Sequence, residues 1–103
     1  MQRVAASYRA ARLGTRVAGK LFAATVVPGY DDTFVRQPGM VDEREDGALY
    51  QKYWQAALDA RPDWILITSF NEWHEGSEIE PSKELGDRYL KLTSEFSRQF
   101  KAR

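Results

Sequence analysis

The sequence predicts an α/β protein with parallel strands, and three observations lead to that prediction. Two apolar runs, residues 21–27 and 64–70, show no alternation of polar and apolar side chains. Such runs are typical of strands that are buried on both faces of a parallel sheet. A helical pattern over residues 47–60 separates the two runs, and this alternation implies strands joined by a right-handed crossover.

Three segments have the apolar spacing of amphipathic helices. The first covers residues 2–13, where Gly14 is expected to end the helix, and the others cover 47–60 and about 86–101. The apolar positions are Val4, Ala5, Tyr8, Ala11 and Leu13; Leu49, Tyr53, Trp54, Ala57 and Leu58; and Tyr89, Leu90, Leu92, Thr93, Phe96 and Phe100. On the middle helix we expect Tyr50, Tyr53 and Trp54 to belong to the core.

Two strands are too few to make a sheet that is covered on both faces. A (β/α)8 barrel takes about 250 residues. We therefore expect the 103 residues to form one partial domain: the C-terminal portion of a (β/α)8 TIM barrel, with about two βα units and a leading helix. Exposed strand edges would favour self-association. The alternative is a complete small α/β domain that dimerises through a strand edge.

Composition excludes several classes of function. With 43% hydrophobic and 29% charged residues, the chain is typical of a soluble globular protein. A formal net charge of +0 offers no electrostatic basis for binding nucleic acid or an anionic membrane. No apolar run approaches the roughly 18 residues of a membrane span. The absence of cysteine excludes disulfides and thiolate chemistry.

Each predicted strand is followed by a long charged loop. Residues 28–46 are expected to form an irregular loop with Pro-Gly breaks, and a second loop begins at Asn71. Long loops in compact domains are often functional. Because both follow the carboxyl ends of parallel strands, we expect them at the face where α/β active sites lie.

The stretch ITSFNEWHEGSEIEP places carboxylates at the end of the second strand. Glu72 and Glu75 are three residues apart, so a helical turn would put them on one side, about 5–6 Å apart. That spacing is close to the carboxyl separation of retaining glycosidases. One carboxyl would stay protonated as an acid while the other stays ionised as a base. A solvated acidic loop is the alternative interpretation.

Other chemistries fit the stretch less well. A zincin motif needs a second histidine at position 78, which holds glutamate, and the chain has one histidine in all. The acids near Asp31 and in this stretch lack the register of an EF-hand. Ser77 has no nearby base and no nucleophile-elbow pattern. We expect neither a metal nor a cofactor.

The stretch FNEWHEG with IE downstream, preceded by PGYDDT, resembles glycoside hydrolase family 99, the endo-α-mannosidases and endo-α-mannanases. It is also similar to family-99-like barrel domains of bacterial polysaccharide loci. The resemblance covers about residues 21–92. It implies a (β/α)8 barrel and retaining hydrolysis of α-mannosidic bonds inside an oligosaccharide or polysaccharide.

The resemblance also implies roles for the two glutamates. Glu72 would remove the proton of the sugar 2-hydroxyl, which attacks the anomeric carbon to give a 1,2-anhydro intermediate. Glu75 would act as general acid and then as general base.

The other expected site residues have substrate-binding roles. Asn71 would orient Glu72 or a sugar hydroxyl, and Trp73 would pack behind the glutamates or stack on a sugar. His74 would hydrogen-bond a glutamate or face the protein. Tyr30 and Asp31 would line the same pocket. For Asp31 and Asp32, capping or turn formation is an equally good interpretation.

Two differences from the family motif leave other functions open. Family members have Thr-Gln where this chain has Ser77 and Glu78, and the continuation EPSKELGDRYL is closer to the polysaccharide-locus relatives. Some of those are labelled as glycosyltransferases, although no glycine-rich phosphate loop is visible here. The alternatives are a family-99-like glycosyltransferase, a polysaccharide-processing protein, or an inactive fragment.

Overall fold

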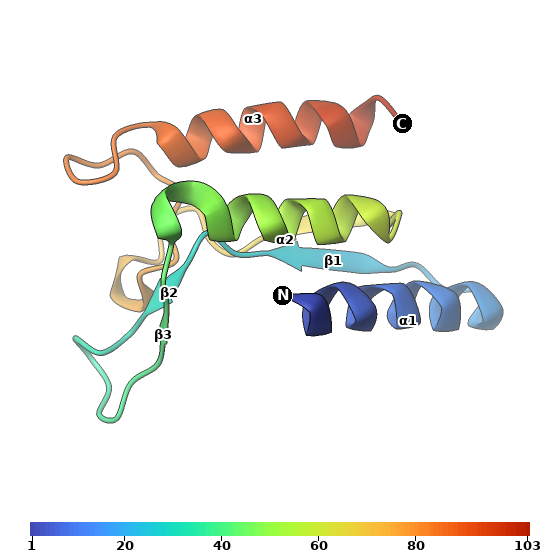
Figure 1. Cartoon of the computed structure of the whole chain (residues 1–103), viewed down its shortest axis with the longest axis horizontal. Helices are drawn as coiled ribbons and strands as arrows, with labels where there is room; N and C mark the ends of the chain where they lie inside the picture. Colours follow the sequence, from blue (N-terminus) through green and yellow to red (C-terminus); the bar gives the residue numbers. More distant parts are fainter.

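A computed structural model describes all 103 residues as an α/β protein with three α-helices and a parallel pair of strands (Figure 1). A short antiparallel pair and two 3₁₀ helices, η1 and η2, occupy the loops. The elements in chain order are α1 (Gln2–Ala18), β1 (Ala23–Val26), β2 (Tyr30–Asp31), β3 (Val41–Asp42), η1 (Glu45–Gly47), α2 (Ala48–Asp59), β4 (Trp64–Ile67), η2 (Trp73–Glu75) and α3 (Arg88–Lys101).

The parallel pair confirms the main prediction from the sequence. β1 and β4 pair in register from Ala23 opposite Trp64 to Val26 opposite Ile67. Helix α2 forms the crossover between them and packs on β1, with α1 on one side and α3 on the other (Figure 1). Because the strands run in the same direction, their carboxyl ends lie at the same end of the molecule.

The core lies between α2 and the sheet. Tyr50 and Trp54 are fully buried, as predicted, whereas Tyr53 is partly buried against the same cluster. The Trp54 ring stacks on Phe96 of α3 with centroids 5.5 Å apart. On α3 the predicted apolar stripe holds for Tyr89 and Phe96, but Leu90 is exposed. The nine buried core residues are Phe22, Ala24, Val26, Tyr50, Trp54, Ala57, Ala60, Ile79 and Tyr89.

The first helix is longer than the sequence predicted. It continues through Gly14 and ends at Gly19, whose φ of 69° is left-handed. There the N–H groups of Gly19 and Lys20 return to the carbonyls of Arg16 and Thr15, as in a Schellman motif. Gly14 is a weak stop because a mid-helix glycine costs only about 0.5–1 kcal/mol relative to alanine.

An ion pair between a buried arginine and a partly exposed aspartate supplies tertiary support for the extended helix. Arg12 is 8% exposed and lies 2.7 Å from the Asp63 carboxylate at the start of β4. The same carboxylate accepts the backbone N–H of Phe22 at 2.8 Å. These two bonds, the backbone bond first, hold the pKa of Asp63 below its ordinary value. The ion pair thus ties α1 to the starts of both strands.

Residues 28–46 were predicted to be an irregular loop, and this is wrong in part. They contain the β2–β3 hairpin, in which Tyr30 lies opposite Asp42 and Asp31 lies opposite Val41. The side chain of Asp32 accepts the N–H of Met40 at 2.6 Å. This hydrogen bond closes the hairpin between residues that are eight apart in the sequence. Local sequence patterns do not predict a contact over that separation.

The prediction that both strands are buried on both faces is also wrong. Ala24 and Val26 face the helices and have no exposed surface, but Trp64 is 62% and Leu66 is 50% exposed. The helices of this chain cover one face of the sheet, so the other face stays open. An α/β unit with one open apolar face is consistent with part of a barrel.

No helix of the structure has both the length and the apolar character needed to cross a membrane.

Two glycines of the first helix provide a test of its boundaries. A Cβ added at Gly14 or at Gly19 would meet no atom within 4 Å, so the two sites differ mainly in backbone conformation. We expect Gly14→Ala to raise the free energy of unfolding by about 0.5–1 kcal/mol. Gly19→Ala should lower it by about 1–2 kcal/mol because φ is positive there.

Urea denaturation followed by circular dichroism measures both changes. If Gly14→Ala destabilises the chain, the helix does not continue through residue 14.

Candidate active site at the carboxyl ends of the strands

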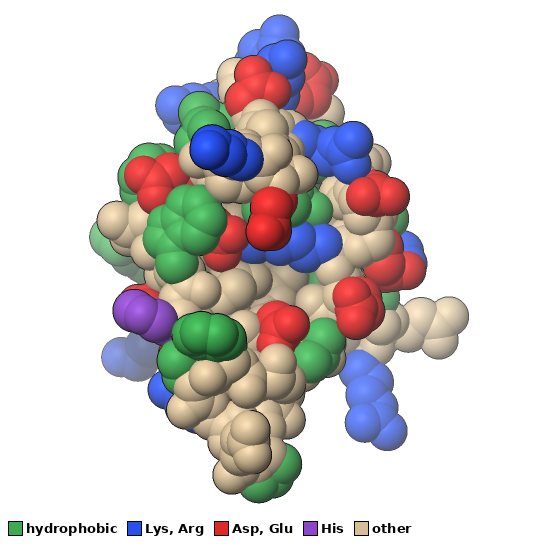
Figure 2. Space-filling model, turned by 90° about the vertical axis from the view of Figure 1, so that its left-hand side faces the viewer, with side chains coloured by type: hydrophobic (Ala, Val, Ile, Leu, Met, Phe, Trp, Pro, Cys, Tyr) green, Lys and Arg blue, Asp and Glu red, His purple; other side chains and the backbone are tan.

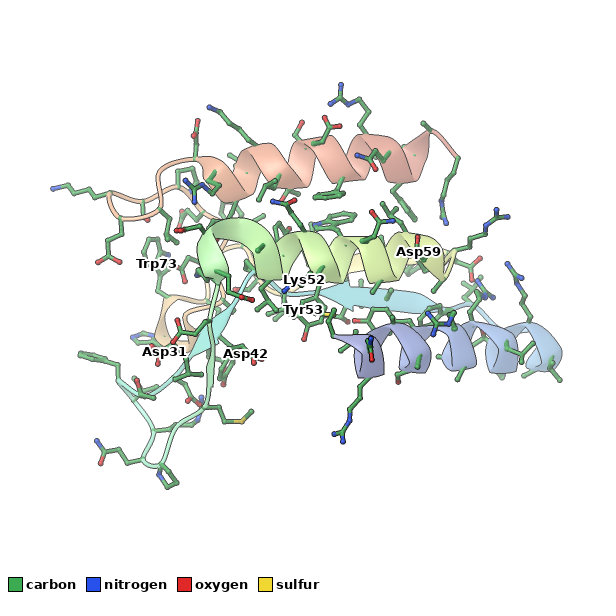
Figure 3. All side chains as sticks on the ribbon, in the orientation of Figure 1. Asp31, Asp42, Lys52, Tyr53, Asp59 and Trp73 are labelled. Carbon is green, nitrogen blue, oxygen red and sulfur yellow. The ribbon has the colours of Figure 1, made fainter.

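Both loops lie at the carboxyl ends of β1 and β4, as the sequence predicted. The β2–β3 hairpin follows β1, and the turn η2 follows β4 and contacts β2. Figure 3 labels Asp31 and Trp73, which come from the two loops and lie at the same end of the molecule. The two loops therefore form one site region.

Glu72 and Glu75 lie on one 3₁₀ turn. The carbonyl of Glu72 accepts the N–H of Glu75 at 3.3 Å, and Glu72 is the residue that precedes η2. Glu72 itself precedes the 3₁₀ helix and has non-helical φ and ψ of −81° and 77°. The structure therefore places the two residues on one turn, and the pairing of their carboxylates stays a prediction.

The turn ends at Gly76, where a glycine is needed. Its φ is 58°, and a Cβ there would lie 2.9 Å from the carbonyl oxygen of Asp31. Any side chain would therefore collide with the backbone of β2. Gly76 allows η2 to pack directly against the hairpin.

Two serines hold the base of the turn. The Ser69 and Ser77 hydroxyls are 2.9 Å apart, and the Ser69 N–H donates to the Ser77 carbonyl at 2.8 Å. The Ser69 hydroxyl also accepts the N–H of Glu72 at 3.0 Å. Ser77 is fully buried. Sequence reasoning considered Ser77 only as a nucleophile and missed this structural role.

A network of four side chains connects the two loops. Arg36 Nη1 lies 3.5 Å from Glu75 Oε2, 2.9 Å from Asp32 Oδ2 and 3.3 Å from the Tyr30 hydroxyl. The Tyr30 hydroxyl donates to Asp32 Oδ2 at 3.1 Å. Tyr30 and Glu75, both predicted site residues, are thus brought together. Arg36 and Asp32 were not selected, although their i, i+4 spacing was a visible signal.

The surroundings of this network lower the pKa of Asp32 and raise the pKa of Tyr30. The Met40 N–H, together with Arg36 and Tyr30, holds the pKa of Asp32 below its usual value. Burial raises the pKa of Tyr30, and the negative charges of Asp32 and Glu75 raise it further. Asp32 is therefore an ionised acceptor, and Tyr30 remains a protonated donor.

Asp31 has a local role. Its carboxylate accepts the N–H and the hydroxyl of Thr33 at 3.0 and 2.6 Å, and these bonds lower its pKa. The turn-forming interpretation of Asp31 is therefore confirmed. Asn71 and His74 are exposed near the glutamates. An exposed His74 contradicts the alternative in which it faces the protein.

Trp73 is held in place at its polar end. Its indole N–H donates to Glu80 Oε1 at 2.7 Å, while 48% of the residue remains exposed. The hydrogen bond limits rotation of the ring. An exposed indole in a set orientation is available to stack on a ligand.

Glu78 is a structural residue. It is 6% exposed and lies 3.2 Å from Arg44, whose guanidinium also donates to the Gly76 carbonyl and covers the Tyr89 ring. Glu78 Oε1 has no aligned hydrogen bond, so its contact with Arg44 is an ion pair. This pair links the segment between β3 and η1 to the segment after η2, and Arg44 reaches α3 through its contact with Tyr89. No group of three His, Cys, Asp or Glu side chains is arranged to hold a metal ion.

A groove of about 1110 Å³ opens beside η2, and we call it the rim groove. Figure 2 looks onto this end of the molecule, where acidic side chains gather around a hollow. Glu72 and Glu75 do not line the rim groove, but Tyr30, Asp31 and Trp73 do. The remaining lining residues are Thr33, Phe34, Val41, Asp42, Glu43, Arg44, Glu45, Asp46, Gly76, Glu78, Ser82, Lys83, Glu84 and Leu85.

Fold and site together define an α/β protein with parallel strands and with two glutamates on the turn that follows the carboxyl end of β4. A sequence profile described as Glycosyl hydrolase family 99 matches residues 5–94. The match covers most of the chain. The chain therefore belongs to glycosyl hydrolase family 99.

Named relatives agree with this assignment. The chain is 41% identical over 96 residues to a glycoprotein endo-alpha-1,2-mannosidase-like protein of Danio rerio, covering 78% of this chain and 22% of that protein. It is 45% identical over 75 residues to the glycoprotein endo-alpha-1,2-mannosidase of Rattus norvegicus, covering 68% and 16%. The chain thus spans a minor part of the length of these relatives.

The structure also matches a solved one. The GH99 endo-alpha-mannosidase from Bacteroides thetaiotaomicron is similar with a TM-score of 0.88 and 33% sequence identity. The match covers 95% of this chain and 34% of that chain. The arrangement of helices and strands described here is thus one that a longer family member contains.

The hairpin network makes stability depend on pH. The pKa of Asp32 is lower in the folded chain than its ordinary value of 3.8. A group of this kind stabilises the fold above the unfolded-state pKa, and the effect is lost as pH falls through the folded-state pKa. We expect Asp32→Asn to lower the melting temperature at pH 7 and to flatten the loss of stability below pH 3.8.

Calorimetry between pH 7 and pH 2 measures this difference. Asp59→Asn, on the exposed side of α2, controls for the loss of one negative charge. If Asp32→Asn and the wild-type chain lose stability in parallel below pH 3.8, the network does not lower the pKa of Asp32.

Proposed function

We propose that this chain is the C-terminal portion of a (β/α)8 barrel that hydrolyses α-mannosidic bonds within oligosaccharides or polysaccharides, with retention of configuration. The observation that carries the proposal is the pair Glu72 and Glu75 on one turn at the carboxyl end of β4, in a chain of family 99. Relatives named as endo-alpha-1,2-mannosidases support the same linkage type.

In the proposed first step, Glu72 removes the proton of the sugar 2-hydroxyl. The oxygen attacks the anomeric carbon, the glycosidic bond breaks, and Glu75 protonates the leaving oxygen. A 1,2-anhydro sugar results. In the second step water attacks the anomeric carbon and gives a proton to Glu75. The bond between the anomeric carbon and the 2-oxygen breaks, and Glu72 returns its proton to that oxygen. Two inversions give net retention.

Both glutamates are open to a ligand. Glu72 is exposed, and its backbone N–H is held by Ser69, so its carboxylate can reach a hydroxyl. The Glu75 side chain is 32% exposed and lies beside Arg36. Asn71 and His74, exposed near the glutamates, would contact sugar hydroxyls.

The rate at which the chain hydrolyses an α-1,2-linked mannose oligosaccharide tests the proposal. We expect Glu75→Gln to lower the hydrolysis rate about 10²–10⁴-fold because general acid–base catalysis contributes that much. Glu95→Gln, an exposed glutamate of α3, is the matched control and should keep the wild-type rate.

The anomeric configuration of the first product, followed by NMR, tests retention separately. An unchanged rate in Glu75→Gln would overturn the role of Glu75, and an inverted product would overturn the two-step mechanism. No hydrolysis by the wild-type chain would favour the inactive alternative.

We also propose that the open face of the sheet binds a second copy when no other strands cover it. Leu66→Lys places a charge on that face and should shift sedimentation toward the monomer. Leu13→Lys is the control and should not shift sedimentation, because Leu13 lies on α1 and is 66% exposed, against 50% for Leu66. A wild-type chain that sediments as a monomer would contradict this proposal.

A further inference from the structure

Arg36 is the residue through which the β2–β3 hairpin reaches Glu75. Its Nη1 lies 2.9 Å from Asp32 Oδ2, 3.3 Å from the Tyr30 hydroxyl and 3.5 Å from Glu75 Oε2. The first two partners lie on the hairpin, and the third lies on the turn after β4. Arg36 thus contacts the residue that the proposed function makes the general acid and base.

The position of Arg36 is fixed by its contacts with Asp32. The backbone N–H of Arg36 donates to the carbonyl of Asp32 at 2.9 Å, and its guanidinium donates to the carboxylate of the same residue, also at 2.9 Å. The side chain is therefore held at both of its ends. Although it is about half exposed, it has little freedom to leave the hairpin.

Asp32 is a firm anchor because it is buried and has several donors. It is 3% exposed, and its carboxylate accepts the Met40 N–H at 2.6 Å and the Tyr30 hydroxyl at 3.1 Å. A Cβ at Gly39 would lie 2.7 Å from Asp32 Oδ1, so the missing side chain at Gly39 leaves room for the carboxylate. A buried charge needs a partner, and Arg36 is the cation that lies beside it. The hairpin therefore places Arg36 without any help from Glu75.

The Glu75 carboxylate depends on Arg36 for its orientation. The backbone N–H of Glu75 is bonded to the Glu72 carbonyl, but the carboxylate itself makes no hydrogen bond and no ion pair other than the one with Arg36. A general acid must hold its proton within hydrogen-bond reach of the atom that receives it. Without Arg36, no other charged or polar side chain would restrict where the Glu75 carboxylate lies.

The contact between Arg36 and Glu75 is also weak enough for a residue that gains and loses a proton. Asp32 matches the positive charge of Arg36 at the shorter distance, whereas Glu75 lies at 3.5 Å without an aligned hydrogen bond. A carboxylate that was the sole partner of an arginine would be held strongly in its charged form. Contacts of this kind are often long before a ligand binds and tighten in the complex.

We propose that Arg36 is a positioning residue for Glu75: its guanidinium, clamped by Asp32, holds Glu75 Oε2 toward the hairpin and so directs the other carboxylate oxygen to the place where the proton is transferred. The inference rests on the proposed function for the acid–base role of Glu75. It gives the hairpin a part in catalysis, because Arg36 acts through Glu75 and not on the ligand.

NMR of the 103-residue chain tests the position of Glu75 without any need for activity. Scalar couplings across the Cα–Cβ bond of Glu75 should report one dominant rotamer in the wild-type chain and an average over rotamers in Arg36→Met. Arg88→Met is the matched control, because Arg88 is similarly exposed (53% against 55%) and also lies 3.5 Å from a carboxylate, that of Asp46. It should leave the Glu75 couplings unchanged.

Kinetics on an α-1,2-linked mannose oligosaccharide test the consequence for catalysis. Arg36→Met should lower kcat by up to about 10²-fold, since a misplacement of about 1 Å can cost that much, and should leave KM nearly unchanged. Added to Glu75→Gln, the same substitution should cost nothing further, because residues that act as a unit are not additive. An equal loss in both backgrounds would show a structural effect and overturn the inference.

A second substitution guards against loss of the fold, because Arg36→Met leaves the buried Asp32 carboxylate without its cation. Arg36→Lys keeps the positive charge, but an ammonium group lacks the planar fork of the guanidinium. We expect Arg36→Lys to have the wild-type circular dichroism spectrum and still to average the Glu75 rotamers. Averaged Glu75 rotamers in the wild-type chain, or couplings that both Arg36 variants leave unchanged, would overturn the inference.

The two readouts separate this inference from the proposed function. A Glu75 rotamer that depends on Arg36, in a wild-type chain without any hydrolysis, would remove the proposed function and keep Arg36 as the residue that positions Glu75. Hydrolysis that depends on Glu75 but is the same in the wild-type chain and Arg36→Met would do the opposite.

Discussion

The packing of α2 on β1 is the contact on which the other features depend. Tyr50, Trp54 and Ala57 present their side chains to Ala24 and Val26, and all five are essentially inaccessible to water. Burying such side chains is worth about 25 cal/mol per Å² of apolar surface. Because α2 also connects β1 to β4, this packing forces the strands to run parallel. Both carboxyl ends, and the loops that follow them, then meet at one end of the molecule.

At that end the two loops are joined by polar contacts rather than by apolar packing. Gly76 allows the turn with the glutamates to touch β2, and Arg36 connects Glu75 to Asp32 and Tyr30. Asp32 is nearly inaccessible, so its charge must be matched by donors. The hairpin thus holds site residues that are far apart in the sequence in one arrangement, as α2 holds the two strands.

Local patterns were sufficient where the interacting residues are neighbours in sequence. The crossover helix and the two strands follow from periodicity, whereas the turn that carries Glu72 and Glu75 was only one of the conformations that their three-residue spacing allowed. The hairpin within residues 28–46 was missed because the bond from Met40 to Asp32 spans eight residues. The longer α1 was missed because its support, Asp63, lies 51 residues from Arg12.

The sequence by itself determined the α/β class and the family, and it placed Glu72 and Glu75 in the loop that follows β4. Each of these follows from the spacing of apolar residues in short segments or from one contiguous motif. Only the tertiary structure decided that one face of the sheet is open, that Arg36 connects the two loops, and that a groove lies beside Trp73. These features depend on which distant residues come into contact, and a linear pattern carries no information about such contacts until the chain has folded.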